Sequence, residues 1–382
     1  MPGPGDVLEL IRAGRAVTRG EVLDITGLSR MTVATRIDAL LDAGLIVENG
    51  TNRVSGGRPA RLLQFNTEHA FVLAAAVDTT HTTVALTDLA GRIHDEERLD
   101  VVIADGPGLT LDAIGDRARA LLERVGVARD RISGMGISVP GPVDPDTGRP
   151  SQPPIMPGWD AYPIVEHLHD LLEVPVLVMN DADAAALGEQ RSAHPDSRSL
   201  CFIKVSSGIG SGIVIDGRVY AGTDGGAGDI GHIKLVGYDD RLCQCGSYGC
   251  LAAVASGGAV ARSLSELGTP AASGSDVGAL LAAGDADAAR LTRDAGRVLG
   301  EVLATVVSVL NPSEVVIGGT LASAPLLTGL RETLYPRSLP RATRHLAISQ
   351  SNLGQRAGVV GLTTLVVERE FSAEAVNTLL GA

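Results

Sequence analysis

Three cysteines and one histidine lie close together in the second half of the chain: His232, Cys243, Cys245 and Cys250. Two glycines inside the cysteine segment, Gly246 and Gly249, allow the backbone to fold sharply enough to direct the three thiolates to one point. Three thiolates and one imidazole are the ligand set of a closed, tetrahedral, structural zinc site. The alternatives are three reduced thiols without a metal, or a redox pair. We predict that these four residues bind Zn²⁺.

The composition limits the class of protein. The 382 residues are enough for two or three domains, and the 45% of hydrophobic residues can fill large aliphatic cores, because only 3% of the residues are aromatic. The net charge of −13 argues against a protein that binds nucleic acid over its whole surface. Residues 1–65 differ, because their eight Arg and seven Asp or Glu give +1, whereas the remainder carries −14. Only this first segment is therefore suited to approach a phosphate backbone.

The sequence gives no sign of export or membrane insertion. It contains no apolar run of the length that spans a bilayer, and the first residues, MPGPGDVLEL, lack the pattern of a signal peptide. The fourth cysteine, Cys201, stands in the apolar segment CFIKV and is typical of a buried strand residue. We therefore expect a cytoplasmic protein with reduced thiols.

The first 65 residues predict a winged helix-turn-helix. Apolar periodicity indicates a helix over residues 6–13, Thr18 and Glu21 form a capping box that begins a second helix, and Ser29 can cap a third helix that runs to about Ala43. A glycine turn separates the second and third helices. Two short apolar strands, LIVEN and ARLLQF, then flank the polar segment NGTNRVSGGRP, which would form the wing.

The outer face of the predicted third helix carries side chains that hydrogen-bond to base edges and phosphates: Arg30, Thr32, Thr35 and Arg36. Arg58, in the wing, follows two glycines and could enter a narrow groove, as Arg-bearing arms do. We interpret these residues as a DNA-binding surface. The alternatives are a three-helix subdomain that binds protein, and surface pairing of Arg36 with Asp38 or Glu48.

Residues 66–382 predict an α/β body with mixed sheets. Strands and helices alternate, and the segments that predict them are residues 71–93, 131–140, 174–189, 199–219, 296–310 and 313–321. Strand–turn–strand patterns stand near the start of two regions, at 71–93 and 199–219. This repetition indicates two lobes that arose by internal duplication.

Several of these segments resemble the ROK family, which is named for repressors, open reading frames and kinases. The matching segments are ISVPGPVD, VMNDADAAALGE, SSGIGSGIVIDGRVYAG, GAGDIGH, CQCGSYGC and NPSEVVIGG. The segments TGLSRMTVATRIDALLDAGLI and SGGRP resemble the repressor branch, which alone carries the helix-turn-helix. The resemblance implies an actin-like, two-lobed sugar-kinase (ribonuclease H-like) fold and a homodimer or tetramer. It divides the chain into residues 1–65, 66–185 and 186–382, with a last helix that returns to the first lobe.

The resemblance also allows a comparison with the kinases of the family, which need four features. Their phosphate-binding hairpin, Asp-x-Gly-Gly-Thr-Lys, is represented here by Asp78–Thr83, which lacks both glycines and the lysine. The position of the catalytic base is held by Asp181, and a second phosphate loop is retained at Ser207–Gly212. Of two sugar-binding glutamates, one is replaced by Asp229 and the other by Ala252. We therefore expect no kinase activity, because the positioning of phosphates and sugar is lost.

The cleft between the lobes is the expected effector site. The residues that the family pattern places there are Asn180, Asp181, Asp229 and His232. In the family, the histidine that matches His232 contacts both zinc and sugar. Asn180 and Asp181 could instead form only a polar elbow that caps the following helix. Trp159 could line the cleft or anchor the lobe, and the effector is a sugar or sugar phosphate, a different compound, or absent.

The sequence thus predicts a DNA-binding transcription regulator, a repressor by its resemblance, that binds an inverted-repeat operator in double-stranded DNA. Its body would contain zinc and would lack kinase activity. The main alternative is a bifunctional protein that is both an ATP-dependent sugar kinase and a DNA-binding protein. A scaffold without DNA contact would require the face with Arg30 and Arg36 to be buried.

Overall fold

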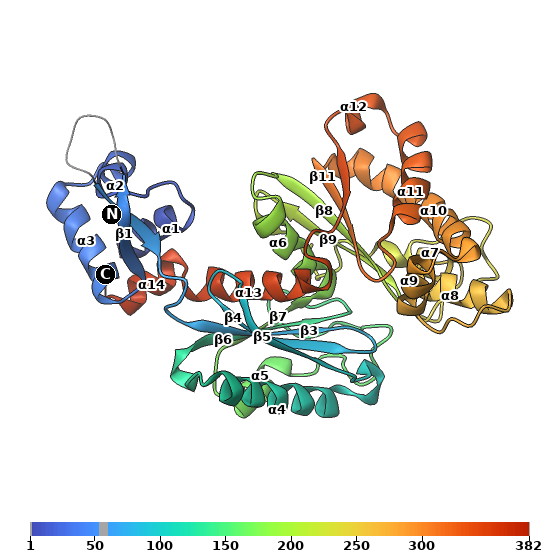
Figure 1. Cartoon of the computed structure of the whole chain (residues 1–382), viewed down its shortest axis with the longest axis horizontal. Helices are drawn as coiled ribbons and strands as arrows, with labels where there is room; N and C mark the ends of the chain where they lie inside the picture. The colour runs from blue at the N-terminus through green and yellow to red at the C-terminus, as the bar shows by residue number, and fades with distance from the viewer. Residues whose placement is uncertain (1, 53–59, 382) are drawn as a thin grey trace.

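The computed structural model describes residues 2–52 and 60–381. Figure 1 shows three parts along the chain: a small domain with the first helices, a first α/β lobe, and a second α/β lobe that contains most of the C-terminal half. In the described ranges, no helix is long and apolar enough to cross a membrane.

The small domain is a helix-turn-helix followed by two antiparallel strands: α1 (Pro4–Arg12), α2 (Arg19–Thr26), α3 (Arg30–Asp42), β1 (Ile46–Asn52) and β2 (Ala60–Phe65). Both predicted caps are present. Thr18 Oγ1 accepts a hydrogen bond from the backbone N–H of Glu21 at 3.2 Å, and Ser29 Oγ accepts one from that of Thr32 at 3.1 Å. Gly27, with φ of 66°, ends α2. The predicted helix-turn-helix with two flanking strands is confirmed.

The first lobe is built on a five-stranded sheet in the order β5-β4-β3-β6-β7. Its strands are β3 (Phe71–Val77), β4 (Thr82–Asp88), β5 (Ile93–Leu99), β6 (Ile132–Val139) and β7 (Val176–Asn180). Two helices, α4 (Pro107–Val125) and α5 (Ile164–Leu172), cover one face of this sheet, and α13 (Ala357–Glu370) covers the other (Figure 1). Short 3-10 helices lie at Ile103–Asp105 and Arg129–Arg131.

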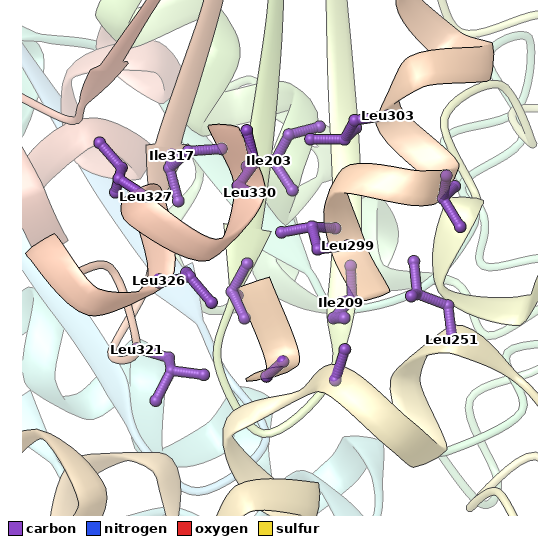
Figure 2. Close-up of a cluster of buried hydrophobic side chains, with 14 of the residues drawn as sticks. Ile203, Ile209, Leu251, Leu299, Leu303, Ile317, Leu321, Leu326, Leu327 and Leu330 are labelled. Carbon is purple, nitrogen blue, oxygen red and sulfur yellow. The ribbon is translucent and has the colours of Figure 1, made fainter. Parts of the chain in front are cut away.

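The second lobe has a sheet in the order β10-β9-β8-β11-β12. Its strands are β8 (Ser199–Val205), β9 (Ile209–Ile215), β10 (Arg218–Val219), β11 (Glu314–Gly318) and β12 (Ala347–Gln350). Its helices are α7 (Leu251–Ala255), α8 (Gly257–Glu266), α9 (Gly274–Ala282), α10 (Ala286–Leu310), α11 (Ala324–Arg337) and α12 (Pro340–Thr343). Figure 2 shows the core of this lobe, where Ile203 and Ile317 of the sheet face Leu299, Leu303 and Leu330 of α10 and α11.

The two sheets have the same topology. In each, a central strand pairs antiparallel with the next strand of the chain and parallel with a later one, which in turn pairs with a parallel edge strand. The order β5-β4-β3-β6-β7 therefore repeats as β10-β9-β8-β11-β12. This repetition is the expected two-lobed body of the actin-like fold.

Two helices connect the parts of the molecule. Helix α6 (Asp181–Ala193) follows the first sheet, packs against β8 and β9 of the second, and contains the boundary expected at residue 185. Helix α13 returns to the first sheet and packs along α6, where a Cβ atom on Gly361 would lie 1.7 Å from the backbone oxygen of Ala184. The last helix, α14 (Ala373–Leu379), packs against α1, and the Gly5 N–H donates to Asn377 Oδ1 at 2.8 Å (Figure 1).

Candidate metal centre and interlobe cleft

The four predicted metal ligands converge in the second lobe. Their ligand atoms, from His232, Cys243, Cys245 and Cys250, all lie within 4.8 Å of one another. His232 ends a 3-10 helix at Ile230–His232, whereas Cys250 is the residue before α7. The Nδ1 atom of His232 lies 3.8 Å from Sγ of Cys243, and Sγ of Cys245 lies 3.7 Å from Sγ of Cys250.

The loop that carries the cysteines is shaped by its glycines. Gly246 has φ of 84° and Gly249 has φ of 75°, values that side-chain-bearing residues rarely adopt. The backbone N–H of Cys243 donates to the oxygen of Ser247 at 2.8 Å, and that of Gly246 donates to the oxygen of Cys243 at 3.0 Å. These bonds fold the segment into a tight turn that brings the thiol groups to one side.

The geometry fits a tetrahedral zinc ion. With Zn–S bonds of about 2.3 Å, two thiolates on a tetrahedron lie about 3.8 Å apart, and a thiolate and an imidazole nitrogen lie slightly closer. The Sγ–Sγ separation of 3.7 Å between Cys245 and Cys250 matches the thiolate spacing, and the Nδ1–Sγ separation of 3.8 Å between His232 and Cys243 is slightly longer than the ideal one. Three soft thiolates and one imidazole leave no open position for substrate, so the centre is suited to a structural role.

The metal centre borders on the cleft through one residue. While Nδ1 of His232 faces Cys243, its other nitrogen, Nε2, lies 3.9 Å from Oδ1 of Asp229. His232, Asp229 and Cys243 all line the large cavity between the lobes. A ligand in this cavity would therefore contact a side chain that a bound metal ion would orient.

The cavity between the lobes encloses about 150 Å³ and is lined from both sides. The predicted effector residues Asn180, Asp181, Asp229 and His232 all lie on its wall, as do Ala252 and Arg262. Trp159 does not line the cavity. Its side chain is fully buried, and Nε1 donates a hydrogen bond to the backbone oxygen of Ile103 at 3.0 Å. Of the two interpretations from the sequence, lining the cleft or anchoring the lobe, the second is therefore correct for Trp159.

Asn180 is the N-cap of α6. Its Oδ1 accepts hydrogen bonds from the backbone N–H groups of Ala182 at 2.8 Å and Asp183 at 3.2 Å. Its Nδ2 donates to the backbone oxygen of Gly141 at 3.0 Å. The polar elbow considered from the sequence is thus present, and it holds the start of α6 against the turn after β6.

A lysine that the sequence reasoning missed lies at the centre of the cleft. Nζ of Lys204, on β8, is 2.6 Å from Oδ2 of Asp181 and 2.7 Å from Oδ2 of Asp78. All three side chains are at most one-fifth exposed. We call these residues the cleft triad. A lysine inside the apolar run CFIKV, in a chain with only one other lysine, was the available signal.

Lys204 and Asp78 of the cleft triad keep their charges in spite of burial. Burial opposes the charged ammonium of Lys204, but the carboxylates of Asp181 and Asp78 outweigh it and raise the pKa of Lys204 above its usual value. Burial likewise acts to raise the pKa of Asp78, yet Lys204 lowers it well below the usual range. For Asp181, burial has the larger effect and raises its pKa.

The turn at Asp78–Thr83 lies beside the glycine loop of the second lobe. The Asp78 N–H donates to the backbone oxygen of His81 at 2.8 Å, which closes the turn between β3 and β4. Thr79 Oγ1 donates to Ser207 Oγ at 3.3 Å, so the turn of one lobe contacts the loop of the other. Thr79 stands at the variable position of the kinase hairpin pattern, whereas Thr80 and His81 stand at its two glycine positions.

The residues predicted to read DNA lie on α3. Arg30 and Thr35 are exposed, whereas Thr32 and Arg36 are half-buried. The hydroxyl groups of Thr32 and Thr35 already contact Ser29 Oγ and the Met31 backbone oxygen. Met31, on the same helix, is 80% exposed. Met31 follows Arg30 directly, so α3 also presents an exposed apolar side chain beside the predicted DNA-binding residues, and it was not among the residues predicted from the sequence.

The alternative considered for Arg36, surface pairing with Asp38 or Glu48, is not the arrangement among the described residues. Asp38 and Glu48 pair with Arg19, at 3.0 and 3.1 Å, and Glu48 also pairs with Arg61. Nη1 of Arg36 is buried and has no hydrogen-bond partner among the described residues. Arg58 lies outside the part of the chain that the structure describes.

The sequence of residues 73–369 matches the model of the ROK family. The chain belongs to the ROK family. It is 26% identical to the xylose repressor of Bacillus spizizenii over 95% of this chain and 94% of the relative. It is 31% identical to the glucokinase of Halalkalibacterium halodurans, over 79% of this chain and 97% of the relative.

A solved structure also matches this chain over almost its whole length. A ROK-family transcriptional regulator, described as a homolog of the Escherichia coli MLC protein, superposes with a TM-score of 0.82 and 26% identity, and covers 99% of this chain and 98% of its own. The repressor and this regulator thus match nearly the entire chain, whereas the glucokinase leaves about one-fifth of it unmatched.

Proposed function

We propose that this chain is a DNA-binding transcriptional repressor whose sensor body is stabilised by zinc and has no kinase activity. The observation that carries the proposal is a helix-turn-helix with an exposed, Arg-bearing third helix, in a chain similar to a xylose repressor over 95% of its length. The uneven charge supports the proposal, because residues 1–65 carry a net charge of +1 whereas the remainder carries −14.

The DNA site follows from the domain. Helix α3 enters the major groove near its N-terminus, where Arg30 and Arg36 contact base edges or phosphates. Arg58, which lies outside the described residues, remains the contact to the minor groove that the sequence predicts. The protein forms a homodimer or tetramer, and two winged domains related by a twofold axis recognise an inverted repeat with half-sites one or more helical turns apart.

A binding-site selection on the full-length protein tests this function. Arg30→Ala and Arg36→Ala should each cost roughly 1–3 kcal/mol of binding free energy if the residue reads a base, and should relax the preference at one position of each half-site. Arg198→Ala is the matched control, because this arginine is 86% exposed on the second lobe. If both α3 variants keep the wild-type preference, α3 does not read the operator.

The body senses a ligand in the interlobe cleft. A sugar-like compound bound by Asn180, Asp229 and His232 would favour one separation of the lobes and would shift the population of that state by its differential affinity. Helix α13 packs against α6 beside the cleft, and α14 packs against α1 of the winged domain. Zinc would hold His232 in place, so metal loss would weaken both the local fold and the ligand site.

A bifunctional sugar kinase is the second candidate, because the chain is 31% identical to a glucokinase and retains Asp181. Three features disfavour it: Asp181 is paired with Lys204, Thr80 and His81 stand where the kinase hairpin has glycines, and Ala252 stands where the family pattern has a second sugar-binding glutamate. An ATP-consumption assay with glucose, mannose, N-acetylglucosamine and xylose should give only background turnover. Sugar-dependent ADP release that disappears in Asp181→Asn would establish the kinase instead.

A further inference from the structure

Two cavities meet at the cleft triad. The larger is the interlobe cleft, which extends to His232 and Asp229. A second cavity is lined by His81 and Thr83 of the first lobe and by Thr320 of the second. The residues that line both cavities are Asp78, Asp181, Lys204 and Ser206. The cleft triad therefore stands at the boundary between the two spaces.

The lobes are in contact at this boundary. Asp78 belongs to the β3–β4 turn of the first lobe, whereas Lys204 belongs to β8 of the second, so their ion pair of 2.7 Å connects the lobes. The hydrogen bond from Thr79 to Ser207 connects the β3–β4 turn with the β8–β9 turn of the second lobe. Anything that passes from one cavity to the other along this wall must displace these contacts.

The charges of the cleft triad have a specific arrangement. Two carboxyl oxygens approach one ammonium nitrogen within 2.7 Å, so two acidic side chains share a single cation. Without the ammonium group, Asp78 and Asp181 would face each other across a gap that is lined by oxygen atoms. Such a pair of carboxylates is a site for a hard divalent cation, which binds oxygen ligands at 2.0–2.6 Å.

We propose that Lys204 is a resident cation that occupies the place of a divalent metal ion between the two cavities and excludes phosphorylated ligands from the cleft. The ammonium group satisfies both carboxylates, so no metal ion is available to bridge them to a phosphate group. The cleft then accepts uncharged polyhydroxy compounds. This ligand class rests on the proposed sensor role of the cleft, whereas the resident cation does not.

The other charges of the cleft agree with this ligand class. Asp229 adds a further carboxylate that can accept hydrogen bonds from hydroxyl groups. Among the described residues, Arg262 is the remaining arginine or lysine on the wall, and its Nη2 donates to the backbone oxygen of Ala253 at 3.0 Å. A phosphate group would bring negative charge against a wall that carries the acidic side chains of Asp78, Asp181 and Asp229. Hydroxyl groups, in contrast, can donate to their carboxyl oxygens and accept from the third N–H of Lys204.

Binding of Mn²⁺ alone, followed by electron paramagnetic resonance, tests the resident cation in the zinc-loaded full-length protein. The wild type should bind no Mn²⁺ at the cleft, whereas Lys204→Met should bind about one ion per chain, with a dissociation constant on the order of 0.1–1 mM for a two-carboxylate site. The double variant Lys204→Met with Asp181→Asn should lose this ion. Lys234→Met is the matched control, because it removes the only other lysine, which is exposed.

Each result decides the proposal. Mn²⁺ binding to Lys204→Met that is absent from the wild type, the control and the double variant supports it. Equal binding to wild type and Lys204→Met, or persistence in the double variant, overturns it. If Lys204→Met does not fold, millimolar Mn²⁺ should restore a cooperative melting transition, and failure to do so also overturns it. None of these readouts depends on DNA binding, so they remain valid if the repressor function is wrong.

The exclusion of phosphorylated ligands has its own readout in the wild-type protein. Millimolar glucose 6-phosphate should leave the melting temperature unchanged relative to sodium sulfate of equal ionic strength. An increase in the melting temperature would show that a phosphorylated sugar is accepted and would overturn this part of the proposal.

Discussion

A buried carboxyl group on α6 should make the stability of this protein depend on pH. Asp183 is 5% exposed, and its Oδ1 has no hydrogen-bond partner among the residues that the structure describes. Burial, with a smaller contribution from the charge of Asp181, raises the pKa of Asp183 to about 8. Replacing Asp183 by Asn keeps the shape of the side chain and removes this titration.

The sign and size of the effect follow from linkage. An aspartate in the unfolded chain titrates near 3.9, so between about pH 4 and pH 8 the folded protein holds a proton that the unfolded chain has released. The stabilising contribution is therefore complete below pH 4 and is lost as pH rises toward 8. The limit for one proton is about 1.4 kcal/mol per pH unit, so the free energy of unfolding should fall by roughly 2–3 kcal/mol between pH 5 and pH 7 through this group.

Urea unfolding of wild type and Asp183→Asn at pH 5, 6 and 7 measures this directly. Because all other titrating groups are shared, the difference in free energy of unfolding between the two proteins isolates Asp183, and it should increase in favour of the variant as pH rises, by about 1 kcal/mol per unit. Asp100→Asn is the control, because Asp100 is 93% exposed and should give a curve parallel to that of the wild type. A constant difference between wild type and Asp183→Asn would refute the reasoning.

Two further predictions concern the metal centre and the packing of α6. Elemental analysis should find about one zinc per chain, and Cys245→Ser should lose the metal and melt at a lower temperature. Cys201→Ala is the control, because Cys201 lies outside the cluster and its replacement should leave the zinc in place. A stable, fully folded metal-free preparation would refute the site. Gly361→Ala should lower the free energy of unfolding in urea by roughly 1–3 kcal/mol or more, because the added Cβ would meet the Ala184 backbone oxygen. Gly108→Ala should be nearly neutral, because no atom lies within 4 Å of the Cβ position there. Equal stability of the two variants would contradict the close packing of α6 and α13.

Features that depend on a few neighbouring residues were predictable from the sequence. The caps at Thr18 and Ser29 bond to backbone groups three residues away, and the structure has both. The cysteines of the metal centre are separated by at most seven residues, and two glycines fix the turn between them, so their convergence was also predictable. In the same way, the strand–turn–strand pattern of each lobe is a local signal, which the repeated sheet topology confirms.

The sequence by itself thus determined the helix-turn-helix and the cysteine cluster, because short loops and local hydrogen bonds specify them, and its resemblance to the ROK family implied the two-lobed fold. Only the tertiary structure decided the partners of distant residues. Lys204 lies 126 residues from Asp78, and Gly5 lies 372 residues from Asn377, yet both pairs are in contact. A buried charge must find a partner, but the sequence does not say which of many carboxylates will be brought close. The order and pairing of the strands decide that, so the charge balance of the cleft and the position of α14 on α1 follow from the fold.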